Sequence, residues 1–402
     1  MDKPLPADPA CRPHLYWLDL LKLIAIFMMV AGHCGDFVPQ AERASDWYQV
    51  WGTVYNSLMR PAIPLFVMIT GALLLPVKQT ASAFYAKRLP RVLIPFALWA
   101  LFYALFPLLT RLLGFPPSTV TDFFPWAPTD QSGTAALFYI AEIPFDFSPF
   151  CVQMWYIYTL IGIYLYLPIF SAWVKQATDK EQRLFLGLWG LTLFIPYLRE
   201  LPQLAVAILG ENHALIPYFK DFLGTKLWGV CSWNEFGMLY CFAGFNGYLL
   251  LGHYLKNHPF AGSWAKLLAL CLPMFAVGYA ATLIGFKHMV SLPGATEPMI
   301  ELFFTYCSPN VFLMTLPLAL IAQKVNYTNV TFRRLMVSLS SCTFGIWMIH
   351  YFCLYPCKRL VDLLQLHTMV SLVVTSVFLL AVNWLLVAAV RRIPNVGTKI
   401  MG

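Results

Sequence analysis

The sequence predicts an all-α integral membrane protein with about ten transmembrane helices in one bundle, and two observations lead to this fold class. Of the 402 residues, 59% are hydrophobic and only 11% are charged, against about 25% charged in soluble domains. Such a chain has too little polar surface to coat a water-soluble globule, so lipid must be its main solvent. The second observation is a series of apolar runs, each long enough to cross a hydrocarbon core of about 30 Å.

Ten such runs divide the chain, and no water-soluble domain fits between them. They lie near residues 17–35, 51–76, 91–113, 153–174, 183–199, 236–256, 265–286, 300–323, 337–357 and 368–390. The longest gaps, 114–152 and 200–235, are rich in Pro and aromatic residues and have room for short re-entrant or interfacial helices. We expect residues 1–402 to form a single domain, with 17–35 as a retained first helix and not a cleaved signal peptide.

The loop charges predict the orientation of the chain. If the N-terminus is cytoplasmic, 17 Lys and Arg residues fall in inside segments and 8 in outside segments. This bias places both termini in the cytoplasm. The net charge of +8 comes from these short loops and indicates no nucleic-acid partner. The ten cysteines form no CxxC pair and no His-Cys metal spacing, so we expect no metal site.

Ionisable side chains within apolar runs are the first candidates for function, because they are costly in lipid. The first run carries Asp19, Lys22 and His33. Lys22 and His33 share a helical face and lie ~16 Å apart along the axis, so His33 lies near the outer side. Asp19 precedes Lys22 by one turn and can pair with it.

Two more runs place a charged or titratable group near the outer level. Arg60 lies about nine residues below the outer surface in the second run, and His350 lies ~20 Å above the inner face in the ninth. Three helices thus bring His33, Arg60 and His350 to a similar depth. Simpler interpretations stay open: each His as a hydrogen-bonded structural residue, Arg60 snorkelling to the interface, and Asp19 with Lys22 as a structural pair.

Further candidates lie at the two membrane surfaces. Arg88 and Arg91, with Lys87, precede the third run and suit either a phosphate site or simple positive-inside anchoring. At the outer edge, aromatic and acidic residues suit a sugar, although an interface belt and solvated loops are the plainer explanations. With Asp19, these candidates for substrate binding are Trp155, Tyr156, Tyr158 and Glu235.

Five segments together resemble the membrane acyltransferase-3 family of sugar O-acyltransferases. They are Leu18-Asp19-Leu20-Leu21-Lys22 with Ala31-Gly32-His33, Arg60-Pro-Ala-Ile-Pro-Leu-Phe-Val-Met-Ile-Thr-Gly71, Arg88-Leu-Pro-Arg91, Met154-Trp-Tyr-Ile-Tyr with Leu167-Pro-Ile169, and Ser341-Cys-Thr-Phe-Gly-Ile-Trp-Met-Ile-His350. Lys22 stands where the family has Arg, which keeps the charge but not the bidentate fork. The Trp155-Tyr156 segment and residues 236–254 are most similar to the branch that holds enterobacterial common antigen O-acetyltransferase.

The resemblance implies transfer of an acyl group, usually acetyl from acetyl-CoA, to a hydroxyl of an envelope glycan or its lipid-linked precursor in the bacterial inner membrane. It requires no metal. His33 would be the general base or transient acyl acceptor. Lys22 and Arg60 would stabilise the oxyanion, and His350 would orient the acceptor or act as a second base. Lys22, Arg88 and Arg91 would hold the donor. The alternatives are a transporter or flippase of lipid-linked sugars and a sensor that has lost catalysis.

Overall fold

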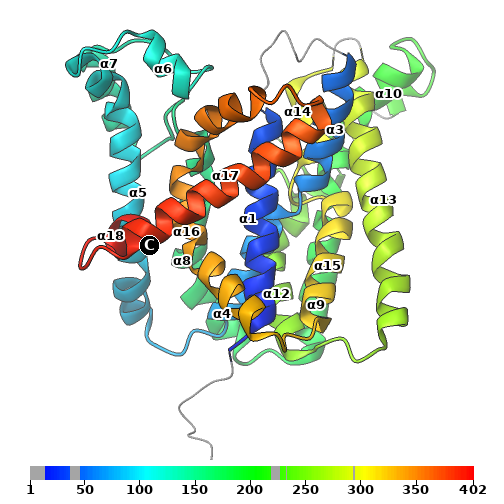
Figure 1. The fold of residues 1–402 in the computed structure, drawn as a ribbon. Coiled ribbons are helices and arrows are strands. Elements are labelled where there is room, and N and C mark those ends of the chain that lie inside the picture. Colours follow the sequence, from blue (N-terminus) through cyan, green and yellow to red (C-terminus); the bar gives the residue numbers. More distant parts are fainter. Residues whose placement is uncertain (1–13, 37–45, 219–226, 232, 293–294) are drawn as a thin grey trace, which may run out of the picture.

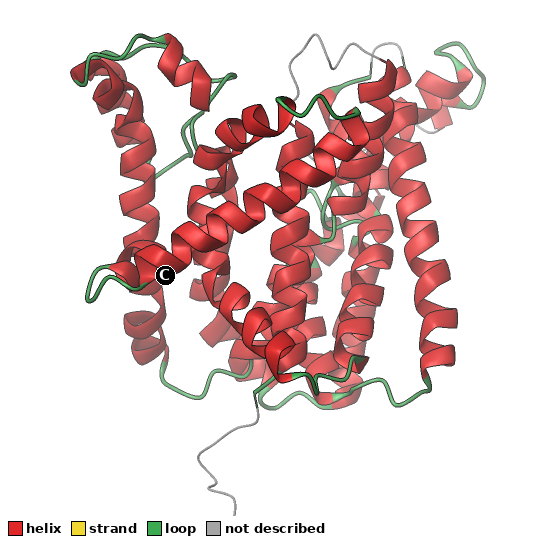
Figure 2. Ribbon diagram, viewed as in Figure 1, coloured by secondary structure: helices red, strands yellow, loops and turns green. Residues whose placement is uncertain are grey.

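The computed structural model describes residues 14–36, 46–218, 227–231, 233–292 and 295–402. Within these ranges the chain is helical and contains no strand (Figure 2), only an isolated bridge between Cys231 and Asn234. The helices are α1 Tyr16–Asp36, α3 Asp46–Met59, α4 Ala62–Leu74, α5 Ala81–Leu112, α6 Ser118–Phe123, α7 Gly133–Glu142, η1 Val152–Met154, α8 Trp155–Val174, α9 Asp179–Thr192, α10 Ile195–Leu209, η2 Leu227–Gly229, η3 Gly237–Phe242, α12 Asn246–Asn257, α13 Trp264–Ser291, α14 Glu297–Glu301, η4 Leu302–Phe304, α15 Pro309–Lys324, α16 Val330–Asp362, α17 Thr368–Arg391 and α18 Gly397–Met401.

In the part of the chain that the structure describes, nine helical segments are long and apolar enough to cross a membrane, which confirms the all-α multi-pass fold. They are Tyr16–Gly35, Gly52–Leu74, Ala81–Leu112, Val152–Val174, Asp179–Val206, Trp264–Ser291, Pro298–Lys324, Val330–Asp362 and Thr368–Arg391. The weak run at 183–199 is among them. The gap at 114–152 holds the short helices α6 and α7, as the sequence allowed.

The expected span at 236–256 is wrong as a single long helix. Residues Gly237–Phe242 form the 3-10 helix η3, and α12 has only 12 residues. Gly237 and Gly244 adopt positive φ angles of 50° and 79°, which an α-helix does not permit, so the helix begins only at Asn246. A short helix is tolerated here because α12 packs inside the bundle and not against lipid.

Helix α12 crosses α4 at very short range through two glycines. A Cβ on Gly71 would lie 1.9 Å from the Leu249 carbonyl oxygen, and a Cβ on Gly252 would lie 1.9 Å from the Met68 carbonyl oxygen. Only glycine permits this backbone contact, as in other close helix pairs in membranes. The crossing fixes α4, the helix that follows Arg60.

Helix starts at one end of the bundle, the lower end in Figure 1, follow from N-cap side chains. Thr80 accepts a hydrogen bond from Ala83 N, and Ser263 accepts one from Lys266 N. Thr178 forms a capping box with Glu181. Such caps satisfy amide groups that would otherwise lack partners where α5, α9 and α13 begin. The loop charges predict that this lower end is cytoplasmic, and that orientation stays a prediction.

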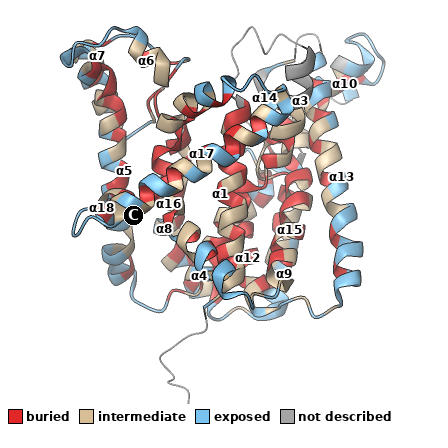
Figure 3. Ribbon diagram, viewed as in Figure 1, coloured by how far each residue is buried: buried red, intermediate tan, exposed pale blue. Residues whose placement is uncertain are grey.

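Burial separates a central group of helices from a peripheral one (Figure 3). The apolar window of α1 is 61% buried, whereas that of α13 is 22% buried. Large apolar side chains of α13 such as Leu272, Val277 and Ile284 are exposed, as expected for a surface that faces lipid. Helix α1 contacts α3, α4, α16 and α17. The polar residues of α1 therefore face protein.

Candidate active site

Two histidines from distant parts of the chain stack on each other in the centre of the bundle. His33 lies on α1 and His350 on α16, and their ring centroids are 5.3 Å apart with an interplanar angle of 30°. The hydroxyl of Tyr351 lies 3.5 Å from His33 Nδ1. The shared depth expected from the sequence therefore corresponds to direct contact between the two imidazoles.

The surroundings of His350 assign its tautomer. Its Nδ1 lies 2.9 Å from the Trp347 carbonyl oxygen and 3.2 Å from that of Ile346, and because carbonyls only accept, Nδ1 carries the proton and donates. His350 is completely buried, and its Nε2 has no hydrogen-bond partner among the described residues. Such a nitrogen is a buried acceptor that can take a hydrogen bond from a water or a substrate hydroxyl.

Arg60 is placed by the break between α3 and α4. Helix α3 ends at Met59, and Pro61 is the N-cap of α4. The guanidinium carbon of Arg60 lies 3.8 Å from the centroid of the Phe304 ring, a cation–π contact that orients the group. This contact lies within the protein and differs from snorkelling to the membrane surface.

His33 and Arg60 line the same small chamber of about 50 Å³. Its walls come from α1, α3, α4, α8, α16 and the segment before α15. The lining residues are Met28, Met29, Gly32, His33, Asn56, Met59, Arg60, Ala62, Ile63, Trp155, Tyr306 and Trp347. Trp155 stacks on Tyr306 with centroids 5.6 Å apart and an interplanar angle of 14°. The chamber thus combines an imidazole, a guanidinium and an aromatic wall.

A second, larger cavity of about 180 Å³ contains Lys22. It is lined by Lys22, Phe66, Ile69, Thr70, Leu73, Tyr156, Ile157, Leu160, Tyr164, Thr343, Phe344 and Trp347. Lys22 Nζ lies 3.7 Å from Asp19 Oδ1, so the expected pair is present. The hydroxyl of Ser340 on α16 donates to the same carboxylate, which also contacts His14. We infer that Asp19 ties α1 to α16 and positions Lys22.

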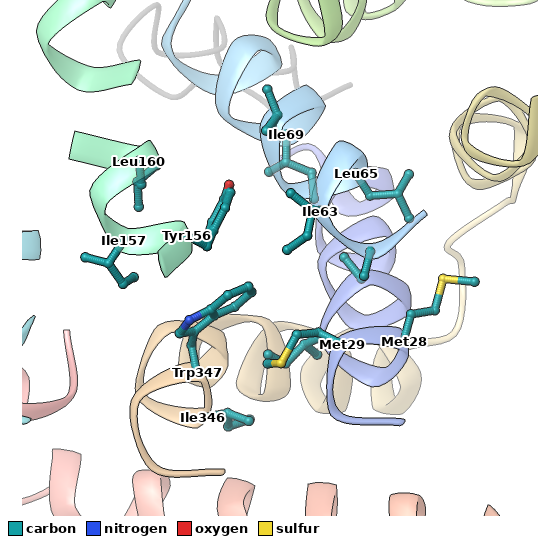
Figure 4. Close-up of a cluster of buried hydrophobic side chains, with 14 of the residues drawn as sticks. Met28, Met29, Ile63, Leu65, Ile69, Tyr156, Ile157, Leu160, Ile346 and Trp347 are labelled. Carbon is teal, nitrogen blue, oxygen red and sulfur yellow. The ribbon is translucent and has the colours of Figure 1, made fainter. Parts of the chain in front are cut away.

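Trp347 is the residue of α16 that borders both cavities. Its indole N–H donates to the Gln153 carbonyl oxygen over 3.1 Å. Figure 4 shows the ring in the space between α8, which carries Tyr156, and the helices that carry Met29 and Ile63. The ring thus lines both the upper chamber, with His33, and the lower cavity, with Lys22.

The basic residues that precede the third apolar run lie near the lower cavity. Arg88 and Arg91 lie on α5, which packs against α8, the helix of the lining residue Tyr164; the Tyr85 hydroxyl, one turn before Arg88, donates to the Leu165 carbonyl oxygen over 2.7 Å. Arg91 is exposed, whereas Arg88 is partly buried, and Arg88 Nε has no hydrogen-bond partner among the residues described. A buried guanidinium N–H without an acceptor suits an anionic oxygen.

Four of the five expected substrate residues lie outside the upper chamber, including Asp19, which pairs with Lys22. The Tyr158 hydroxyl donates to the carbonyl oxygens of Ile143 and Asp146, which anchors the loop after α7. Glu235 is exposed and pairs with Arg199 at 3.3 Å. Tyr156 is buried and lines the lower cavity. Of the aromatic candidates, the structure brings only Trp155 into contact with the upper chamber.

Sequence reasoning missed three residues that line the chamber, Asn56, Tyr306 and Trp347, and it missed Tyr351, which contacts His33. Asn56 precedes Arg60 by four residues and so shares its helix face, which is a signal that was present in the sequence. Tyr351 directly follows His350. For Tyr306 and Trp347 the sequence offered only aromatic residues in apolar surroundings, which are usually core.

Comparison with known families assigns the chain. Residues 15–388 match the family model described as an acyltransferase domain, which is nearly the whole chain. The chain belongs to the acyltransferase-3 family. It is therefore a membrane acyltransferase, with the chamber and the lower cavity inside the matched region. Searches of curated proteins and of solved structures gave no match. Within the described part of the chain, no group of three His, Cys, Asp or Glu residues is placed to hold a metal ion.

Proposed function

We propose that this membrane acyltransferase is an O-acetyltransferase, which moves an acetyl group from acetyl-CoA to a hydroxyl of a cell-envelope glycan or lipid-linked sugar in a bacterial inner membrane. One observation carries the proposal. His33 and Arg60 line one chamber, and Lys22 lines a separate cavity walled by α8, the helix against which the α5 of Arg88 and Arg91 packs. This arrangement suits a donor and an acceptor that reach the reaction from opposite sides.

The donor would bind at the lower end. Phosphate groups of CoA carry the charge that Arg88 and Arg91 can neutralise, and an Arg fork matches phosphate oxygens. The pantetheine arm is long and thin, as the lower cavity requires, and would pass Lys22 on its way up. Lys22 lies below the Trp347 ring, so in this conformation its ammonium serves the donor and not the His33 chamber.

The reaction itself would take place in the upper chamber. His33 removes the proton of the acceptor hydroxyl while that oxygen attacks the thioester carbonyl carbon. The Arg60 guanidinium stabilises the negative charge that develops on the carbonyl oxygen. The carbon–sulfur bond then breaks, and the CoA thiolate takes the proton held by His33. In a two-step variant, His33 accepts the acyl group first and the hydroxyl attacks the acyl-imidazole.

The acceptor would lie against Trp155 and His350. The flat indole of Trp155, already stacked on Tyr306, offers an apolar face for a sugar ring. His350 Nε2 can accept a hydrogen bond from a second hydroxyl of the acceptor. Glu235 and Tyr158 do not line the chamber, because Glu235 pairs with Arg199 and the Tyr158 hydroxyl donates to the Ile143 and Asp146 carbonyls. The similarity of the Trp155-Tyr156 segment to the enterobacterial common antigen branch favours an amino-sugar polymer or its precursor.

The transporter alternative has no support from the family match, which concerns an acyltransferase domain. A deciding experiment uses the purified protein in lipid vesicles with labelled acetyl-CoA and lipid-linked sugars extracted from bacterial membranes. We expect CoA release and a labelled sugar product, with a loss of at least about 100-fold in His33→Ala. His288→Ala, at an exposed site on α13, is the matched control and should behave as wild type. Transfer at the wild-type rate by His33→Ala, or sugar movement without CoA release, would contradict the proposal.

A further inference from the structure

Trp347 stands between two cavities that the proposed function uses for different purposes. We propose that the Trp347 indole is the partition between the donor cavity and the His33 chamber, and that it restricts transfer to short acyl groups. The inference rests on the proposed function for its second half only. The first half, that the ring is the partition, can be tested without any turnover.

The ring is held by contacts on several sides. Its centroid lies 4.8 Å from that of Tyr156 and 5.4 Å from that of Phe66, which meets it edge to face. The indole N–H donates to the Gln153 carbonyl oxygen. Trp347 is only 4% exposed, so protein atoms cover almost all of its surface even where it borders the two cavities. These contacts come from α4, α8 and the turn before α8.

The cavities on the two sides differ in size. The upper chamber has about 50 Å³, which is room for a few atoms beyond the side chains, and the lower cavity has about 180 Å³. An acetyl group adds one methyl beyond the thioester carbonyl, whereas each further methylene needs new space. In the upper chamber that space is taken by Met28, Met59 and the Trp347 ring. The chamber therefore fits the smallest acyl groups.

Empty volume on both sides also gives the ring somewhere to move. Trp347 is almost completely covered, so its ring can swing only if a neighbour such as Tyr156 or Phe66 shifts into the adjoining cavity space. The thioester end of the donor can pass when the ring swings toward either cavity. With the ring in the observed position, water from the lower end does not reach the chamber.

Two positions on α4 report on the partition directly. Ile63 lines the upper chamber and Thr70 lines the lower cavity, seven residues apart on one helix face. Ile63→Cys and Thr70→Cys would be treated with a charged, membrane-impermeant thiol reagent from the Lys87–Arg91 side of sealed vesicles. Mass spectrometry of each peptide measures the modified fraction separately from the native cysteines. The full-length protein is used throughout.

We expect Thr70→Cys to react whether Trp347 is present or replaced by Ala. Ile63→Cys should react at least about tenfold more slowly than Thr70→Cys, and adding Trp347→Ala should bring the two rates together. Equal rates at both positions with Trp347 intact would overturn the partition. So would an Ile63→Cys that stays protected in the Trp347→Ala protein.

The choice between acyl donors tests the other part of the proposal, that Trp347 restricts transfer to short acyl groups. Trp347→Phe and Trp347→Leu would be compared with wild type using acetyl-CoA and butyryl-CoA. Burial of two further methylenes favours the longer chain by about tenfold once space exists, so the butyryl-to-acetyl ratio should rise by about that factor. The control is Trp189→Phe, because Trp189 is also buried and its indole N–H also donates to a backbone carbonyl, that of Gly244.

The ratio separates selectivity from general damage, because destabilisation lowers both activities together. An unchanged ratio in both Trp347 variants would overturn the role in selectivity. If wild type releases no CoA from any thioester, the proposed function fails, while the thiol labelling still decides whether Trp347 is the partition.

Discussion

The two cavities on either side of Trp347 differ in charge and in volume. The upper chamber is small and contains His33 and Arg60, with His350 stacked behind His33. The lower cavity is more than three times larger, and apart from Lys22 its lining is aromatic, aliphatic or hydroxylic. Groups that can move a proton or stabilise an oxyanion are thus concentrated where there is least room, and volume for binding lies where such groups are few.

This difference indicates a division of work along the bundle axis. Buried charges are costly in a membrane, and a protein retains them where function needs them. In the upper chamber they are held by stacking: His33 against His350, and Arg60 against Phe304. In the lower cavity Lys22 is held by an ion pair with Asp19. We expect substitutions above Trp347 to change kcat, and substitutions below it to change KM for the donor.

Replacement of Arg60 should give the largest effect. Arg60→Ala removes the only guanidinium among the residues that line the chamber, and loss of one oxyanion-stabilising group typically costs about 10²–10³ in kcat. The measurement is steady-state CoA release at saturating acetyl-CoA. Arg359→Ala is the matched control, because Arg359 also lies over an aromatic ring, that of Tyr355, but far from the chamber. A change in KM with kcat unaltered would contradict the proposal that residues above Trp347 act on kcat.

Replacement of His350 should come next. Asn can keep the hydrogen bond that His350 Nδ1 donates to the Trp347 carbonyl, but it lacks an equivalent of Nε2. His350→Asn should therefore fold normally and lower kcat by about 10–100-fold, the range for a positioned acid–base or orienting group. His253→Asn is the control, since His253 is also buried with Nδ1 bonded to a backbone carbonyl, that of Leu75. Full activity in His350→Asn would show that the His350 imidazole only packs against its neighbours and takes no part in the reaction.

How far the sequence anticipated this site depends on the kind of information needed. Helix rise is fixed at about 1.5 Å per residue, so the common depth of His33, Arg60 and His350 could be counted from the loops. In the structure His33 stacks on His350, and His33 lines one chamber with Arg60. Hydropathy likewise predicted nine of the spans. It failed at 236–256, where Gly237 and Gly244 interrupt a run whose composition is apolar.

Contacts between helices could not be predicted from the rise per residue. Lys22 and His33 share a face of α1, yet they line different cavities because Trp347 of α16 lies between them. Rotation of α16 about its own axis decides this, and no local pattern encodes it. Tyr158 and Glu235 were chosen for their level at the outer edge, but their side chains bond to Ile143, Asp146 and Arg199 instead.

Replacement of Lys22 should give the smallest effect and tests the lower cavity. Lys22→Gln keeps the length of the side chain but removes the charge, and the expected result is a rise of about tenfold in KM for acetyl-CoA with kcat within about twofold, the scale of one partly exposed charge contact. Lys22→Arg should bind the donor at least as well, because its fork matches phosphate or carbonyl oxygens. Lys324→Gln is the control, because Lys324 is a lysine at the lower end that donates to the Gly262 carbonyl and lines neither cavity.

High salt should weaken donor binding in wild type more than in Lys22→Gln, because screening acts on the charge that the variant lacks. If Lys22→Gln instead lowered kcat and left KM unchanged, Lys22 would act on the transition state, and the Trp347 ring would have to leave its observed position for the ammonium to reach the chamber.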